Sequence, residues 1–141
     1  MLRNDTQAAI ALLQKERLTC AVCRGDTVYK STARGVAPLL HWLDNGLCFR
    51  GFCAADKVVG AGAAYLYVLL GLTELYADVI SEKALDILTR FDVSVDFGLY
   101  VARIRNRAGD GYCPIEEAVE DVTDPQDAPA RIRARLATLQ K

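Results

Sequence analysis

The sequence is poor in histidine and in net charge, and each shortage removes a class of function. A formal charge of -1 over 141 residues gives no electrostatic basis for binding nucleic acid or an anionic membrane. The longest stretch without a charged side chain, residues 58–73, is shorter than the roughly 20 apolar residues that cross a bilayer. The single histidine, His41, cannot form a metal site by itself. We therefore expect no nucleic acid and no membrane among the partners.

The N-terminus also lacks a basic start followed by an apolar segment, so a secretory signal is not expected. The chain has five cysteines, an odd number, and most of them lie in apolar segments. This pattern is typical of free thiols in a reducing compartment. The expected location is therefore the cytoplasm.

Hydrophobic residues make up 52% of the chain and charged residues 25%, which is typical of a soluble globular protein with one domain. A first helix is predicted over residues 6–15. Residues 18–23 and 27–31 flank the turn Arg24-Gly25-Asp26 and predict a β-hairpin. Residues 34–43 predict a short second helix, with Pro38 near its first turn.

The middle of the sequence alternates between strand and helix patterns. Residues 47–54 form a mostly apolar run that suits a central strand, and a helix is predicted from about Asp56 to Leu70. Residues 72–80 predict the next strand, Ser81 caps the following helix, and residues 93–97 alternate as a strand does. This order implies parallel strands joined by right-handed crossovers.

The last quarter of the sequence is less regular. Glycines predict a loop over residues 107–111, and Cys113-Pro114 starts a helix with acidic residues in its first turn. Residues 124–129 have the composition of a linker, and residues 131–139 predict a short basic helix.

Four groups of motifs, taken together, resemble one family. They are Ser31 with Arg34-Gly35-Val36 and Pro38-Leu39-Leu40, then Ala55-Asp56-Lys57-Val58-Val59-Gly60, then Ile80-Ser81-Glu82-Lys83-Ala84-Leu85, and finally Asn106-Arg107 with Cys113-Pro114 and Glu116. Over roughly residues 6–120 the chain resembles the DUF1893 family, which has the fold of the cytidine deaminase superfamily. The resemblance implies a three-layer α/β/α sandwich whose mixed sheet begins with the N-terminal hairpin. Residues 1–122 would form this deaminase-like domain, and residues 123–141 a C-terminal linker with a short basic helix.

Zinc deaminases hold their metal with ligands from two helix starts, one with a His or Cys near a catalytic Glu, the other with Pro-Cys-x-x-Cys. In this chain the first predicted helix start has Cys53-Ala54-Ala55-Asp56, and the second has Ser81-Glu82, which includes no thiol. Cys113-Pro114 reverses the order of the second motif. We therefore expect no zinc, no other metal site and no cofactor.

In open α/β folds a ligand commonly lies beyond the carboxyl ends of the strands, where helix N-termini converge. The predicted order brings three helix starts to that edge: Asp56-Lys57, Ser81-Glu82 and Cys113-Pro114. Their backbone N–H groups favour a small anionic or nucleotide-like ligand. The candidate ligand-binding residues are Arg34, Ser81, Glu82, Asn106 and Arg107.

Two other functions stay open. Cys113 precedes a helix, where a thiolate is stabilised, so Cys113, or Asp56 with Lys57, are candidate catalytic residues of a transferase or hydrolase. A structural or assembly role through a homodimer would use exposed aromatic side chains, for which the candidates are Tyr65, Tyr67 and Tyr76. Many of these residues also have a plain structural interpretation, since Ser and Asp commonly cap helices and free Cys is commonly buried.

Overall fold

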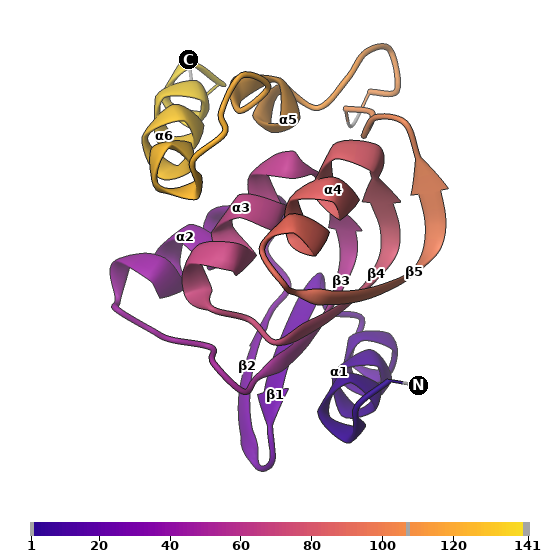
Figure 1. The fold of residues 1–141 in the computed structure, drawn as a ribbon. Coiled ribbons are helices and arrows are strands. Elements are labelled where there is room, and N and C mark those ends of the chain that lie inside the picture. Colours follow the sequence, from indigo (N-terminus) through magenta and orange to yellow (C-terminus); the bar gives the residue numbers. More distant parts are fainter. Residues whose placement is uncertain (1, 107, 140–141) are drawn as a thin grey trace.

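The computed structural model describes residues 2–106 and 108–139, which form one five-stranded sheet with helices on both faces (Figure 1). The strands are β1 (Cys20–Arg24), β2 (Thr27–Ser31), β3 (Cys53–Val59), β4 (Glu74–Ser81) and β5 (Ser94–Val101). The helices are α1 (Asn4–Lys15), α2 (Ala37–Asp44), α3 (Ala61–Leu70), α4 (Glu82–Arg90), α5 (Pro114–Ala118) and α6 (Ala128–Leu139), with a 3-10 turn, η1 (Pro125–Asp127), before α6. Within the described residues, none of the helices has the length and apolar character needed to span a membrane.

The sheet is mixed and has the order β2-β1-β3-β4-β5. β1 pairs antiparallel with both β2 and β3, whereas β3, β4 and β5 run parallel. Parallel neighbours need a crossover, and α3 and α4 provide the two crossovers here. The hairpin turns at Gly25, whose φ of 57° lies in the left-handed region that glycine adopts readily. The predicted α/β fold with an N-terminal hairpin is therefore confirmed.

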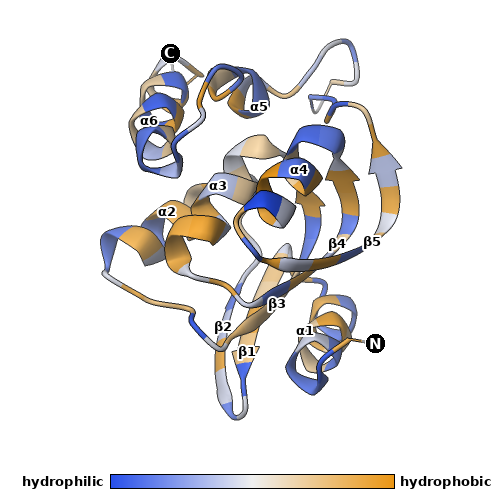
Figure 2. Cartoon of the chain, viewed as in Figure 1, coloured by the Kyte–Doolittle hydropathy of each residue, from blue (hydrophilic) through white to orange (hydrophobic). Residues whose placement is uncertain are grey.

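The helices form a layer on each face of the sheet. α1 packs on β1, β3 and β4 on one face, and α2, α3 and α4 cover the other (Figure 1). Figure 2 shows hydrophilic residues along the exposed side of α4 and hydrophobic ones in the strands beneath it. Each interface has its own buried cluster, with Leu13 and Ala55 on the α1 side and Leu75 and Ile87 on the other. The arrangement is the three-layer sandwich that the resemblance implied.

The helix predicted from about Asp56 is the largest error of the sequence interpretation, because Asp56 and Lys57 lie inside β3. α3 begins only at Ala61, five residues after the predicted start at Asp56. The β-branched pair Val58-Val59 favours an extended backbone, which explains why the strand continues past Lys57.

The strand predicted over residues 47–54 is also displaced, since β3 starts at Cys53. The preceding residues form a turn in which Gly51 has a φ of 80°. Phe49 and Phe52 in this turn are buried, and their rings lie 5.3 Å apart, with Tyr29 of β2 beside both. The apolar run is therefore core-forming, although most of it is not a strand.

The tyrosines expected on the surface are mainly internal. Tyr65 and Tyr67 of α3 are fully buried, and Tyr76 of β4 is half-buried against the cluster under α1. α3 lies between the sheet and the C-terminal segments, so residues on all sides of this apolar helix are buried. The Tyr65 and Tyr67 hydroxyls form hydrogen bonds inside the protein, to Val122 and Asp56. They offer no exposed aromatic surface for a dimer.

The C-terminal elements pack onto α3. The Tyr65 hydroxyl donates to the carbonyl oxygen of Val122 at 2.5 Å, and Ala128 and Ile132 of α6 are fully buried. Asp124 caps η1 by accepting the N–H of Gln126, so the segment expected to be a linker is ordered. The basic helix starts at Ala128, three residues before its predicted start.

Gly98 lies where the residue-by-residue pairing of β3, β4 and β5 is interrupted by one position in each strand. The strand register passes from Asp56↔Ala77↔Phe97 to Val58↔Val79↔Leu99, and leaves Lys57, Asp78 and Gly98 without assigned partners. A Cβ at Gly98 would lie 2.9 Å from the backbone oxygen of Asp78 and 3.2 Å from the Tyr76 hydroxyl oxygen. Only glycine fits there without moving the backbone of β4.

We expect Gly98→Ala to lower the free energy of unfolding by about 2 kcal/mol, because the added methyl group meets a backbone atom that cannot rotate away. Urea denaturation measures the change. Ser94→Ala, at an exposed position in the same strand, is the control and is expected to change stability by less than about 0.5 kcal/mol. Equal effects of the two substitutions would contradict the close approach.

Candidate functional site

Glu116 of α5 connects three segments at the carboxyl edge of the parallel strands. Its carboxylate accepts the N–H of Ala61, the first residue of α3, at 3.0 Å and the hydroxyl of Ser81 at the start of α4. Its second oxygen accepts the N–H of Ile104, in the segment after β5, at 2.8 Å. Glu116 is buried, so these bonds are shielded from water. The predicted helix starts thus do converge, with α3 starting later than expected.

The starts of α3 and α4 are shaped for this carboxylate. Gly60 precedes α3, and a Cβ on it would lie 3.3 Å from the Glu116 Oε2 atom, so glycine permits the close approach. Ser81 accepts the N–H of Ala84 as a helix cap and donates its hydroxyl to Glu116. A negative charge beside two helix N-termini is stabilised by the helix dipoles. The chain therefore supplies its own anion where an external one was expected.

Ile104 fixes the backbone of the segment after β5. Its N–H is held by Glu116, and its carbonyl oxygen accepts the N–H of Cys113 at 2.8 Å. A Cβ on Gly60 would be 3.3 Å from the Ile104 side chain, which therefore points inward to the start of α3. In an extended backbone neighbouring side chains point to opposite sides, so Arg103 and Arg105 face outward together.

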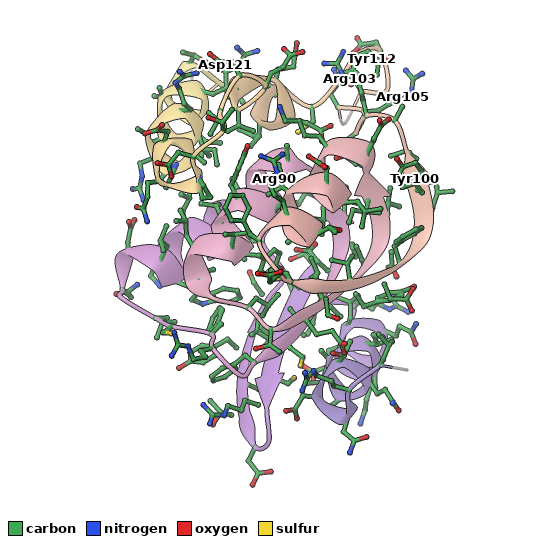
Figure 3. The ribbon with its side chains drawn as sticks, in the orientation of Figure 1. Arg90, Tyr100, Arg103, Arg105, Tyr112 and Asp121 are labelled. Atoms are coloured by element: carbon green, nitrogen blue, oxygen red, sulfur yellow. The ribbon has the colours of Figure 1, made fainter. Side chains whose placement is uncertain are left out.

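Arg103, Arg105 and Tyr112 form a surface cluster that we call the arginine–tyrosine platform (Figure 3). The guanidinium carbon of Arg103 lies 4.2 Å from the centre of the Tyr112 ring, and that of Arg105 lies 5.7 Å from it. Arg105 and Tyr112 also form an isolated β-bridge. All three side chains are exposed, and neither arginine forms an ion pair with any residue that the structure describes.

The loop between the two sides of the platform is closed by Asn106. Its amide nitrogen donates to Asp110 at 3.0 Å, its side-chain oxygen accepts the N–H of Gly109, and its own N–H donates to Gly111. These contacts give Asn106, a predicted ligand-binding residue, a role in shaping the loop. Arg107, the other predicted residue of this loop, lies outside the described residues.

Asp56 forms a second polar centre under α3. It is half-buried, and its carboxylate accepts the Tyr67 hydroxyl at 2.6 Å and the N–H of Val58 at 3.2 Å. Burial raises the pKa of Asp56 to about 7. The hydrogen bonds from Tyr67 and Val58 lower this pKa, and the charge of Asp78 raises it by a smaller amount. Burial and the nearby Asp56 charge raise the pKa of the Cys20 thiol on the adjacent strand, so that thiol stays protonated.

The other predicted residues are dispersed. Lys57 is exposed on β3, and Arg34 is exposed between β2 and α2, at the edge of the sheet opposite to β5. Glu82 lines a groove beside α4, and Cys113 is partly exposed at the position before α5. The structure thus brings Ser81, Cys113 and Asn106 to the same edge as Glu116, whereas Arg34, Asp56 and Lys57 are elsewhere.

All five cysteines are free thiols in the structure. Cys20 and Cys23 face different sides of the sheet, because they belong to different buried clusters. Among the described residues, no group of three His, Cys, Asp or Glu side chains is placed to hold a metal ion.

Sequence interpretation missed Arg103, Arg105 and Tyr112. One local signal was available, since Arg103-Ile104-Arg105 alternates charged and apolar side chains as an extended segment with one buried side does. The approach of Tyr112 to these arginines depends on the loop between them and could not be derived from spacing. Glu116 was considered only as part of a motif and as one of the acidic residues in the first turn of its helix.

Comparisons with known proteins agree on one family. The sequence profile of the domain of unknown function DUF1893 matches residues 8–136, which extends past the end of the resemblance expected near residue 120. A solved structure described as a DUF1893 family protein from Thermotoga maritima has 22% sequence identity and a TM-score of 0.85. The alignment covers 98% of this chain and 92% of that chain, so the two share a fold.

No curated protein matches the sequence. The descriptions of the matching family and structure name neither an activity nor a ligand, and the deaminase superfamily stays a prediction. Because the profile covers most of its length, the chain belongs to the DUF1893 family.

Proposed function

We propose that the protein binds a small nucleotide-like anion on the arginine–tyrosine platform, beside the converging starts of α3 and α4. The observation that carries the proposal is the pairing of two exposed guanidinium groups with one exposed tyrosine ring, at 4.2 and 5.7 Å. An aromatic face stacks on a base, and arginine forks match the geometry of a phosphate. The platform therefore combines the two kinds of contact that a nucleotide requires.

The backbone under the platform is held before any ligand arrives. Ile104, between the two arginines, uses both its N–H and its carbonyl oxygen in hydrogen bonds to Glu116 and Cys113. A site that is ordered in advance loses less conformational entropy when a ligand binds, so a small number of contacts can give measurable affinity. The net charge of -1 favours a small ligand over a nucleic acid strand, and the described part of the platform offers the two guanidinium groups of Arg103 and Arg105 to it.

Isothermal titration with AMP, adenosine and inorganic phosphate tests the proposal. AMP is expected to bind, and adenosine and phosphate are each expected to bind at least about tenfold more weakly, because each makes only part of the contacts. Arg103→Gln and Tyr112→Ala should each weaken AMP binding by about tenfold, which equals about 1.4 kcal/mol.

Arg24→Gln is a matched control, because Arg24 also lies over an aromatic ring, at 5.9 Å from Phe52, and belongs to the hairpin. This control should bind AMP like the unchanged protein. The proposal fails if millimolar AMP gives no binding heat, or if Arg103→Gln binds AMP as well as Arg24→Gln does.

A further inference from the structure

A groove of about 560 Å³ lies between α4 and the end of β5, and its lining ends at Ala102, the residue before the platform's Arg103. One wall is a stripe of α4, and the other consists of Tyr100 and Ala102. The α4 residues that line it are Glu82, Lys83, Leu85, Asp86 and Thr89. Tyr100 is 47% exposed, so this aromatic side chain is available to a partner. Figure 3 shows Tyr100 at the outer side of β5.

β5 forms one margin of the sheet, so its outer backbone groups have no strand partner among the described residues. It is eight residues long, with no proline and no lysine, and Leu99 is 56% exposed. Edge strands are normally protected from pairing with another chain by proline or charged residues such as lysine, or by a segment that covers the edge. The one local protection is Asp96, whose carboxylate accepts the N–H of Phe97 at 2.9 Å. Figure 1 shows no helix beside the outer edge of β5.

We infer that the groove and the β5 edge together bind an extended peptide with a basic side chain, which adds to the sheet as a further strand. Backbone hydrogen bonds to the edge would hold the peptide, while its alternate side chains enter the groove beside α4. Leu85 and Tyr100 offer apolar contact at the groove, and Glu82 offers a carboxylate without an ion pair among the described residues.

The charges favour a basic peptide over a second copy of this chain. Asp86, the other carboxylate of the groove, pairs with Arg90 at 2.6 Å, and the Lys83 ammonium donates to the carbonyl oxygen of Glu120, so Glu82 is the carboxylate left for a basic side chain. In a pair of β5 strands the incoming strand would bring no cation to Glu82, because Asp96 is its single charged residue. A peptide that alternates apolar and basic residues supplies that cation.

The test uses two capped, fluorescein-labelled heptapeptides, one alternating valine with lysine and one alternating valine with glutamate. Fluorescence anisotropy is expected to show at least about tenfold tighter binding of the lysine peptide. Glu82→Gln should weaken that binding by about three- to tenfold, and Asp26→Asn, the same kind of change at the tip of the hairpin, should leave it unchanged. Hydrogen exchange followed by NMR should show slower exchange of β5 amides with the lysine peptide bound.

Equal affinity for the two peptides, or binding without protection of β5 amides, would overturn the inference. So would the absence of binding at millimolar peptide. A concentration-dependent dimer in light scattering, with β5 amides already protected in the absence of peptide, would assign the edge to a second copy instead. Because the platform is not involved, Arg103→Gln should bind the lysine peptide normally, which separates this inference from the proposed function.

Discussion

Replacing Glu116 with alanine is expected to lower the free energy of unfolding by about 3 to 5 kcal/mol, among the largest effects of any single substitution in this chain. The substitution leaves two backbone N–H groups and the Ser81 hydroxyl without an acceptor in a buried place. Each such unpaired group costs about 1 to 3 kcal/mol. Urea denaturation followed by circular dichroism measures the loss.

Glu117 is the matched control, because it is the next residue of the same helix and is exposed. Glu117→Ala should change stability by less than about 0.5 kcal/mol, since its nearest cation, Arg135, lies 3.9 Å away at the surface. If Glu116→Ala were as stable as Glu117→Ala, Glu116 would not be the connection between the helix starts.

Asp56 is expected to make the folded protein less stable as the pH rises from about 4 to about 7. In the unfolded chain this carboxyl loses its proton near its ordinary pKa of 3.8, whereas in the folded chain burial raises the pKa to about 7. Between these values the folded state binds more protons than the unfolded state, so stability falls with rising pH. The full shift corresponds to about 4 kcal/mol, and water around a half-buried group reduces this to about 2 kcal/mol.

Asp56→Asn removes the titrating group and should be more stable than the unchanged protein by about 2 kcal/mol above about pH 8, with little difference near pH 4. Denaturation curves at several pH values measure this difference. Asp96→Asn, at an exposed position in β5, is the control and should show no such pH dependence. A difference between Asp56→Asn and the unchanged protein that stays constant with pH would contradict the raised pKa.

The features of the fold that could be predicted from the sequence are those determined by residues close together in the sequence. The glycine turn between two alternating segments predicted the hairpin, and the structure has strands with bounds close to those expected. Ser81 and Pro114 marked helix starts correctly, because capping and the fixed φ of proline act within one turn.

The errors arise where a distant residue decides the outcome. Asp56 resembles a helix cap, yet it lies in a strand, where the hydroxyl of Tyr67, eleven residues later, donates to its carboxylate. Glu116 reads as an ordinary acid in a first helical turn, but it accepts bonds from residues 12, 35 and 55 positions away. Such contacts depend on how crossovers place the helices, which local patterns do not contain.

The Glu116 carboxylate already occupies the place beside the starts of α3 and α4 where a bound anion would otherwise be needed. In proteins that fold around a bound anion or metal, removal of the ligand exposes unpaired backbone donors and loosens the structure. Here the donors at the starts of α3 and α4 are already satisfied by the chain itself. Under the proposed function, occupancy of the arginine–tyrosine platform would therefore follow the ligand concentration while the scaffold stays unchanged, as suits a reporter of abundance better than a permanent carrier.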